Sequence, residues 1–454
     1  MHECLHACLF MIILHYYLTA CIYTSMIDLL LLRIPFKSDF VLQTQSHDGV
    51  GGRYGQYVDL IEICKLSGCM LGARTVEFCI DGDLKISDLN HPFESLPSSF
   101  GSLAVKIHAG STTMMPCVEI KASPAKLLQG HNVFGSENLE LCSTELLSGL
   151  AYGMPKLFDL LDVSNTNLDW IDVTYSAHVD NELIAQQVID SLKNVTSGQT
   201  KKSRYNREYQ TTVEWNTGSQ LKSLKVYLKY YEVINQLNEL KKLSLTRPDD
   251  QLLLKKINIL SNEDLINFAR RCIRFEARLK HTYLEKHNIP RNLFKFIKYQ
   301  KDNEKKGKNV IRELWLSSFN DILLAIKGAE MNIYDDNKIR RLLNDSFFTI
   351  TKTGKMSYSR ANKIYQFYRS LLNDGYQFVR NSMPRNTFWR YEQNLLSIGL
   401  SKLQLQNLQQ QKNNVIPMFR VIDIDFNKQR PTWYQEPTSF YDNNENLLLF
   451  KFAS

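Results

Sequence analysis

Three carboxylates occur within stretches of sequence that are otherwise typical of β-strands. They are Asp172 in WIDVTYS, Glu119 in CVEIKAS and Glu276 in RFEAR. A buried carboxylate without a cation beside it is costly, so each of the three needs a positive partner. Mg²⁺ or Mn²⁺ is one such partner, because two or three carboxylate oxygens can bind it. His131, in LQGHNVFG, is a further candidate ligand, although a histidine between Gly and Asn is more often a turn residue.

Arginine is the alternative partner for these carboxylates. Arg274 and Arg278 lie two residues on either side of Glu276, which places all three on one face if 271–279 is a strand. The pattern therefore predicts either a metal site or structural ion pairs, and the residue spacing does not separate the two. Both arginines are also candidates to bind DNA, together with the other basic residues of 196–330.

Tyr227 is the candidate nucleophile. It lies in KSLKVYLKYYE, with Lys225 and Lys229 expected on the same strand face. Two ammonium groups nearby would lower the phenol pKa from its ordinary value of about 10 and would also bind phosphate. A tyrosine activated in this way can attack a phosphodiester and hold the broken strand covalently. The simpler interpretation is a tyrosine on the surface of a sheet, since the chain has 22 tyrosines.

The motifs of several common enzyme classes are missing from the sequence. It contains no P-loop, dinucleotide-binding fingerprint, G-x-S-x-G or H-E-x-x-H motif, and no His-hydrophobic-His pair. An ATP-driven motor, a dehydrogenase and a common hydrolase are therefore disfavoured. The nine cysteines form no C-x-x-C pair, which argues against a disulfide framework or a structural zinc site.

The hydrophobic periodicity predicts an α+β fold with a mixed or antiparallel sheet. Short runs rich in Val, Ile and aromatic residues predict strands, and residues 142–152, 182–194, 291–299 and 309–327 predict helices. The chain is also expected to be helical from about Glu232 until a late strand at 271–279. The predicted strands are 27–34, 74–80, 102–108, 115–121, 168–176, 209–215, 223–230 and 271–279.

The last part of the chain predicts a helical domain with helices at 336–345, 359–372, 384–396 and 400–410. The third of these carries Arg385, Trp389 and Arg390, and such a helix suits the major groove of DNA. An ordinary helical bundle with a basic face fits the pattern equally well. The polar tail after Gln435 is expected to be mobile.

Charge is distributed unevenly along the chain. Residues 1–195 carry a net charge of −11, residues 196–330 carry +12 and residues 331–454 carry +7. An acidic first part suits a metal and a basic remainder suits a polyanion. A solvated surface of mixed charge is the alternative interpretation.

The first 25 residues differ from the rest because they are apolar and rich in cysteine. A signal peptide would carry a basic start, whereas no Lys or Arg precedes Arg33. A membrane anchor would be interrupted by several polar residues, including Asp28. We favour a third interpretation, in which translation starts at Met26 and residues 1–25 are a non-native extension.

Long stretches of the sequence resemble the replication-initiator endonucleases of filamentous bacteriophages, the gene II family. In order, they are MIDLLLLRIPF, ARTVEFCIDGDL, HPFESLP, PCVEIKASPAKLLQGHNVFG, LLDVSNTNLDWIDVTYSAHVDNELIAQQVIDSLKNVTSGQTK and RFEARLKHTYL. The resemblance implies a phage rolling-circle initiator. Such an enzyme binds the origin of the double-stranded replicative form and nicks one strand through a covalent 5′-phosphotyrosine. It leaves a 3′-OH primer, and later cuts and recircularises the displaced single strand.

The resemblance also implies the setting. It predicts Mg²⁺ or Mn²⁺ as cofactor and origin duplex and displaced single-stranded DNA as partners, with host helicase and polymerase beside them. The protein is expected in the host bacterial cytoplasm, without stable membrane association. An endonuclease domain is expected at 26–330 and a DNA-binding domain at 331–454, which Met331 could begin as a separate product from an internal start. A non-catalytic origin or single-strand binding regulator remains the alternative.

The blocks WIDVT, VYLKYYE and RFEAR are also similar to those of plasmid rolling-circle initiators, in which a strand aspartate binds metal and a downstream tyrosine attacks. That similarity implies Tyr227 as nucleophile and Asp172 as metal ligand, with Glu119 and Glu276 as supporting ligands. Glu232 is a reserve ligand. Tyr175, Tyr230, Tyr231 and Tyr283 stay open as alternative nucleophiles.

Overall fold

The computed structural model describes residues 26–45, 54–69, 72–78, 84–90, 94–97, 102–179, 181–195, 200–201, 203, 209–326, 336–351, 354–408, 429–439 and 441. The expected extension 1–25 and the possible internal start Met331 lie outside the described residues.

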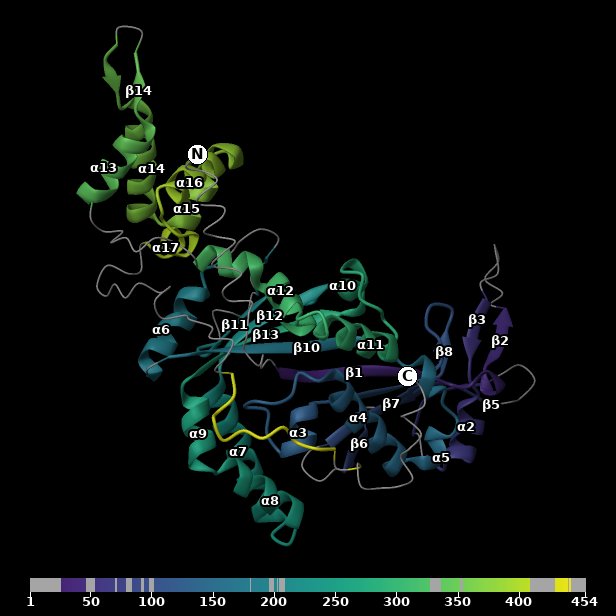
Figure 1. Cartoon of the computed structure of the whole chain (residues 1–454). Helices are drawn as coiled ribbons and strands as arrows, with labels where there is room; N and C mark the ends of the chain where they lie inside the picture. Colours follow the sequence, from purple (N-terminus) through teal and green to yellow (C-terminus); the bar gives the residue numbers. More distant parts are fainter. Residues whose placement is uncertain are drawn as a thin grey trace.

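An eight-stranded sheet forms the centre of the molecule (Figure 1). Its order is β11-β12-β13-β10-β1-β9-β7-β6, and every neighbouring pair is antiparallel. The α+β class is therefore confirmed, with an antiparallel rather than a mixed sheet. The strands are β1 (Met26–Pro35), β6 (Glu94–Pro97), β7 (Ser102–His108), β9 (Cys117–Ala122), β10 (Asn167–His178), β11 (Thr212–Trp215), β12 (Lys222–Leu228) and β13 (Cys272–Lys280).

One face of this sheet carries the main hydrophobic core. Alternate residues of the central strands, such as Leu30 and Leu32 of β1 and Phe275 of β13, are fully buried in it. Helices α4 (Leu139–Gly153), α6 (Glu182–Leu192), α11 (Leu293–Glu304) and α12 (Val310–Ile326) contribute their apolar residues to the same core. Trp315 of α12 also donates its indole N–H to the carbonyl of Phe275 at 3.0 Å, which fixes the helix on the sheet.

Two irregularities between β1 and β10 each leave a carboxylate without a direct partner on the neighbouring strand. Ile27 pairs with Val173 and Leu29 with Asp172, so Asp28 is the extra residue of a bulge. At the second shift, Leu31 pairs with Trp170 and Leu32 with Leu168, so Asp169 is extra. A bulge redirects the side chain that it contains, and both carboxylates are redirected here into polar clusters.

A helical insertion lies between β12 and β13 on the other face of the sheet. It consists of α7 (Lys229–Thr246), α8 (Gln251–Leu260) and α9 (Glu263–Arg270), and it extends away from the sheet in Figure 1. Val233 and Leu237 of α7 pack with Val133 and Phe134, which follow the short helix α3 (Pro124–Gln129). This small second core holds the loop after α3 against the insertion.

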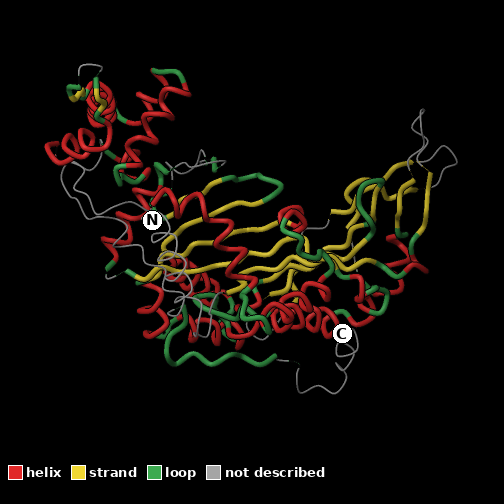
Figure 2. Tube along the Cα trace, turned by 45° about the horizontal axis from the view of Figure 1, so that its top comes forward, coloured by secondary structure: helices red, strands yellow, loops and turns green. Residues whose placement is uncertain are grey.

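Smaller elements at one end of the sheet were not predicted, apart from β4. They are β2 (Leu42–Gln45), β3 (Tyr54–Tyr57), α2 (Leu60–Ser67), the pair β4 (Gly72–Phe78) and β5 (Leu84–Asn90), and β8 (Gly110–Ser111). Figure 2 shows these strands as a group at the end of the molecule that lies away from the C-terminal helices. None of them contributes a residue to the site described below.

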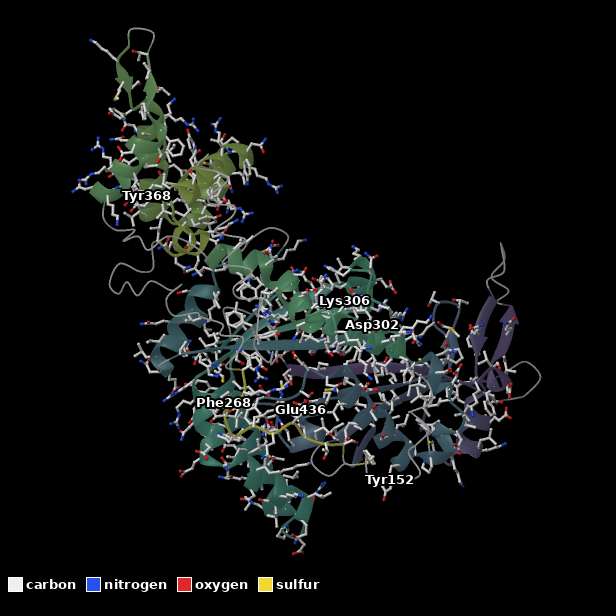
Figure 3. All side chains as sticks on the ribbon, viewed as in Figure 1. Tyr152, Phe268, Asp302, Lys306, Tyr368 and Glu436 are labelled. Atoms are coloured by element: carbon white, nitrogen blue, oxygen red, sulfur yellow. The ribbon has the colours of Figure 1, made fainter. Side chains whose placement is uncertain are left out.

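The C-terminal helices form a lobe with its own core at the opposite end (Figures 1 and 3). The predicted helices correspond to α13 (Asp336–Phe347), α14 (Ser359–Asp374), α16 (Arg385–Ser397) and α17 (Lys402–Asn407). Helix α15 (Tyr376–Ser382) and the hairpin of β14 (Thr349–Ile350) and β15 (Met356–Ser357) are additional. The helical character of this part is confirmed.

Residues 429–439, which we call the strap, run back along the sheet domain. Gln429 bonds to both backbone groups of Ser176, and its oxygen accepts from the N–H at 2.6 Å while its amide donates to the carbonyl at 2.8 Å. Ser439 donates to Glu145 at 2.7 Å. The tail after Gln435, which is expected to be mobile, thus lies against the sheet domain at Ser439.

Candidate active site

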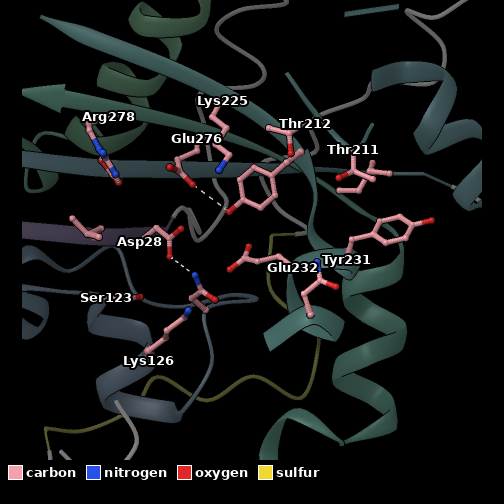
Figure 4. Close-up of a pocket in the computed structure, with 16 residues that line it drawn as sticks. Asp28, Ser123, Lys126, Thr211, Thr212, Lys225, Tyr231, Glu232, Glu276 and Arg278 are labelled. Carbon is pink, nitrogen blue, oxygen red and sulfur yellow. Dashed lines mark hydrogen bonds and ion pairs between the residues drawn. The ribbon is translucent and has the colours of Figure 1, made fainter. Parts of the chain in front are cut away.

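A cavity of about 460 Å³ opens on the face of the sheet that carries the helical insertion. Strands β1, β10, β12 and β13, the start of α7 and the region of α3 all contribute side chains to it (Figure 4). Its ionisable lining consists of the carboxylates Asp28, Asp172, Glu232 and Glu276, the cations Lys126, Lys225 and Arg278, and the phenols Tyr227 and Tyr231.

Tyr227 is one of the residues that line this cavity. Its hydroxyl donates to Oε2 of Glu276 at 3.2 Å, as the dashed line in Figure 4 marks, and its side chain is buried. The Nζ atoms of Lys225 and Lys229 lie 5.0 and 5.9 Å from the centre of its ring. Lys229 begins α7 and does not continue the strand as expected.

The pKa of Tyr227 does not follow the sequence prediction. Burial raises it well above the ordinary value, and the charges of Glu276 and Glu232 raise it further. The expectation that two lysines favour the phenolate is therefore wrong for the protein without ligand. The lysines are close to the ring, but burial of the hydroxyl and the carboxylates around it outweigh them.

Asp172 is held by an arginine. Its two oxygens accept hydrogen bonds from Arg278, one from Nε at 2.8 Å and one from Nη2 at 2.7 Å. The side chain of Asp172 is 3% exposed. Burial raises the pKa of Asp172 and the guanidinium opposes that rise. The arginine partner that the sequence left open is thus present, and 38% of the Arg278 side chain stays exposed beside the cavity.

Asp28 and Glu276 complete a group of carboxylates on adjacent strands. Asp28 accepts a hydrogen bond from Nδ2 of Asn132 at 2.8 Å. Burial, followed by the charges of Asp172 and Asp28, raises the pKa of Glu276 to about 8. Such mutual repulsion is what a bound cation would relieve.

Lys229 is a buried ammonium at the edge of the cavity. It donates to Oδ1 of Asn132 at 2.9 Å and to Glu232 at 2.7 Å. Burial lowers the pKa of Lys229 to about 8. Although burial opposes it, the charges of Lys229 and Lys126 lower the pKa of Glu232 to about 2, so Glu232 is ionised at neutral pH.

Two of the expected metal ligands do not line the cavity. Glu119 accepts from Nε of Arg33 at 2.9 Å and lies 3.5 Å from Nε2 of His108, in a separate polar cluster that also contains Asp169. His131 is buried against Phe134, and burial lowers its pKa to about 3. Neither side chain reaches the carboxylates around Tyr227.

The expected DNA-binding arginines have different surroundings. Arg274 is 2% exposed, donates to the carbonyl of Asn132 at 2.7 Å and also bonds to that of Val133, so its position does not present it to DNA. Arg385 and Arg390 are exposed on α16 of the C-terminal lobe. The indole of Trp389 beside them is 62% exposed.

Among the alternative tyrosines, only Tyr231 lines the same cavity, and its hydroxyl bonds to Glu182. Tyr175 packs on Trp315 in the main core, Tyr283 bonds to Ser317 at 3.2 Å, and the ring of Tyr230 lies under Arg270. These three side chains do not line the cavity.

Sequence reasoning missed Asp28, Lys126 and Asn132. Asp28 has a signal, since it is an acid within the apolar run MIDLLLL, but it was counted only as an interruption of that run. Lys126 and Asn132 carry no local signal, because only the tertiary structure brings the region after β9 beside β12.

A metal site is not evident from geometry alone. Within the described part of the chain, no three His, Cys, Asp or Glu side chains are grouped closely enough to hold a metal ion. Asp28, Asp172 and Glu276 nevertheless offer the oxygen ligands that Mg²⁺ prefers, and their repulsion favours a cation. Their chemistry therefore fits a divalent cation, with Arg278 as its competitor for Asp172.

The chain matches family models for proteins of phage DNA replication. Residues 26–306 match the model of the N-terminal part of the replication-associated gene II protein, and residues 350–440 match the model of its C-terminal part. The chain belongs to this family of replication-associated proteins.

Individual relatives agree with the family models. The chain is 47% identical over 426 residues to the replication-associated gene II protein of Salmonella phage IKe, covering 93% of this chain and 99% of that protein. It is 46% identical over 415 residues to the protein of the same name from Enterobacteria phage M13, covering 91% and 99%. The resemblance to the filamentous phage family is confirmed, and the chain is a replication-associated protein of that family.

A solved rolling-circle replication initiator protein from Geobacillus stearothermophilus also matches. It is 12% identical with a TM-score of 0.19, over 57% of this chain and 74% of that one. This similarity is too low to show a shared fold.

Among the described residues, no helix is both long and apolar enough to cross a membrane.

Proposed function

We propose that the chain is a site- and strand-specific DNA endonuclease with strand-joining activity that initiates phage rolling-circle replication. The observation that carries the proposal is the cavity in which the hydroxyl of Tyr227 lies 3.2 Å from Glu276 among carboxylates and cations. A nucleophile, a base and phosphate-binding cations within one cavity suit phosphoryl transfer. Membership of the gene II family supports the same activity.

In the proposed reaction the oxygen of Tyr227 attacks the scissile phosphorus, and the bond to the 3′ oxygen breaks. Glu276 accepts the phenol proton, and the 3′ oxygen leaves as a hydroxyl that takes a proton from water. Burial and the charges of Asp172 and Asp28 raise the pKa of Glu276 to about 8, which makes its carboxylate a stronger base for the phenol proton. In the reverse step the protonated Glu276 returns this proton to the leaving phenolate. A 3′-OH then attacks the phosphotyrosine, which reseals the strand without ATP.

The cations of the cavity suit the phosphate. Lys225, Lys126 and Arg278 line it and would bind the non-bridging oxygens of the scissile phosphate. Mg²⁺ or Mn²⁺ would neutralise further charge on those oxygens. Asp28, Asp172 and Glu276 are its candidate ligands, although they would have to come closer together than in this structure. Glu119 and His131 are left out of this ligand set because they lie outside the cavity.

We further propose a division of the chain into two functional parts. The endonuclease part is 26–330, and 331–454 is a DNA-binding part in which Arg385 and Arg390 contact phosphates. The partners of the whole protein are the origin duplex, the displaced single-stranded DNA, and the host helicase and polymerase. It acts in the host bacterial cytoplasm. A product that starts at Met331 would contain the C-terminal part without Tyr227.

A second candidate function is a non-catalytic DNA-binding regulator of replication. The raised pKa of Tyr227 and the engagement of Asp172 by Arg278 favour it, since both oppose cleavage by the protein as it stands. It predicts origin binding without nicking.

The test uses protein that begins at Met26, supercoiled DNA with the phage's own origin, and Mg²⁺ or Mn²⁺. We expect relaxed circles with protein attached at the 5′ end, and mass spectrometry should place the attachment at Tyr227. Tyr227→Phe should abolish the adduct, whereas Tyr231→Phe is the matched control from the same cavity. Attachment at another tyrosine would refute the assignment of Tyr227, and binding without nicking by either metal would establish the second candidate.

A further inference from the structure

The loop after α3 brings one uncharged side chain between the carboxylates and the buried lysine of the cavity. That side chain is Asn132, which is 7% exposed. Its Nδ2 donates to Oδ1 of Asp28 at 2.8 Å, and its Oδ1 accepts from Nζ of Lys229 at 2.9 Å. A carboxylate accepts only and an ammonium donates only, so these two partners fix the orientation of the amide.

The backbone of this loop is held without the Asn132 side chain. Arg274 donates to the carbonyls of Asn132 and Val133, and Gln129 donates to those of His131 and Phe134. The amide is therefore not needed to shape the loop. Both of its hydrogen bonds go to residues of the candidate site.

The two partners of Asn132, Asp28 and Lys229, both belong to the surroundings of Tyr227, the candidate nucleophile. Asp28 faces the cavity together with Asp172 and Glu276, and it reaches that position through a bulge, which strand pairing does not hold in place. Lys229 lies 5.9 Å from the centre of the Tyr227 ring and has no continuing strand to orient it. An amide that bonds to both fixes their separation.

We propose that Asn132 is a positioning residue of the nicking reaction, which orients Asp28 and Lys229 across the site without touching the DNA. This inference rests on the proposed function. It explains why an uncharged residue occupies this position: a carboxylate here would still accept from Lys229 but would repel Asp28, and an aliphatic side chain would leave both charges without this partner.

The test measures single-turnover formation of the protein–DNA adduct on an oligonucleotide that carries the origin strand, with Mg²⁺ or Mn²⁺ present. Fluorescence anisotropy measures the affinity for the same oligonucleotide. Asn132→Leu removes both hydrogen bonds and Asn132→Asp removes only the one to Asp28. Asn238→Leu is the matched control, because Asn238 is exposed on α7 and does not line the cavity.

We expect adduct formation to slow about 100-fold in Asn132→Leu and about 10-fold in Asn132→Asp, since a buried hydrogen bond to a charged group is worth roughly a factor of ten or more. The affinity for DNA should stay within about 2-fold of the wild type for both variants. Asn238→Leu should change neither quantity. Asn132→Asp decides the question if the leucine variant does not fold.

Adduct formation within about 2-fold of wild type in Asn132→Asp and in any folded Asn132→Leu would overturn the inference. So would a loss of affinity as large as the loss of rate, because it would assign Asn132 to DNA binding. A wild-type protein that binds but forms no adduct would instead refute the proposed function, so the two failures are distinguishable.

Discussion

The contact between Gln429 and Ser176 predicts that one side chain of the strap contributes measurably to the stability of the sheet domain. Within the described part of the chain, β10 pairs with β1 only as far as Thr174, so no described strand pairs with the backbone groups of Ser176 on that edge. The carboxamide of Gln429 bonds to both of them, and both residues are buried. The substitution Gln429→Met keeps the length of the side chain and removes both bonds.

The magnitude follows from the two backbone groups that lose their partner. A buried polar group without a hydrogen bond costs about 1–3 kcal/mol. Water entering from the strap side would offset part of this, so we expect the free energy of unfolding to fall by about 2–4 kcal/mol. Gln429→Glu keeps the acceptor for the N–H of Ser176 and loses the donor to its carbonyl, so the loss should be smaller.

Urea denaturation followed by tryptophan fluorescence measures these changes. Gln435→Met is the matched control, because Gln435 belongs to the same strap and is exposed. It should change the free energy of unfolding by less than about 0.5 kcal/mol. The reasoning is refuted if Gln429→Met is as stable as this control.

Three further predictions concern the cavity and the C-terminal lobe. The pKa of Glu276 is raised to about 8 in the folded state, so folding retains a proton there and stability should fall as pH rises from about 5 to 9. In metal-free buffer, Glu276→Gln should reduce this loss of unfolding free energy, by up to about 5 kcal/mol at pH 9. Parallel curves of unfolding free energy against pH for the wild type and the variant would contradict the prediction. Arg278→Met leaves Asp172 buried and unpaired, so thermal unfolding should show a loss of about 2–3 kcal/mol, discounted for the exposed part of the arginine. Asp172→Asn added to it should recover most of that loss, and no recovery would count against the pairing. Arg385→Gln with Arg390→Gln should lower the slope of log affinity against log salt by about 2 if both contact phosphates, and an unchanged slope would exclude them from the interface.

Most of the main sheet was predictable from the sequence because its strands carry their own signal. The run MIDLLLLRIP is apolar enough to be the central strand β1, and the alternation in RCIRFEARL gives β13 one polar and one apolar face. Both follow from the period of two that side chains have along a strand. The small strands β2, β3 and β8 lack that periodicity, and pairing decides them: β2 pairs with the next strand, β3, and β3 pairs with the distant β8.

The candidate site was predictable only in part. Tyr227, Asp172 and Glu276 were chosen from local pattern, and the register of β10 with β13 and of β13 with β12 brings them to one cavity. Glu119 has the same local pattern, but its place on β9 puts it opposite Arg33 and away from that cavity. Residue type alone does not distinguish these positions, because the partner strand and its register decide which carboxylates meet.

The sequence by itself determined most strands of the main sheet, the helical C-terminal part and the family, since each depends on local periodicity or on ordered similarity. Only the tertiary structure decided the charge state and surroundings of the site. Asp28 enters the cavity through a bulge, and Asn132 reaches it from a loop held by Arg274. Burial among carboxylates raises the pKa of Tyr227, although two lysines lie beside it in the sequence. The physical reason is that a pKa depends on every charge nearby and on the water excluded, and both are set by contacts between segments far apart in the chain.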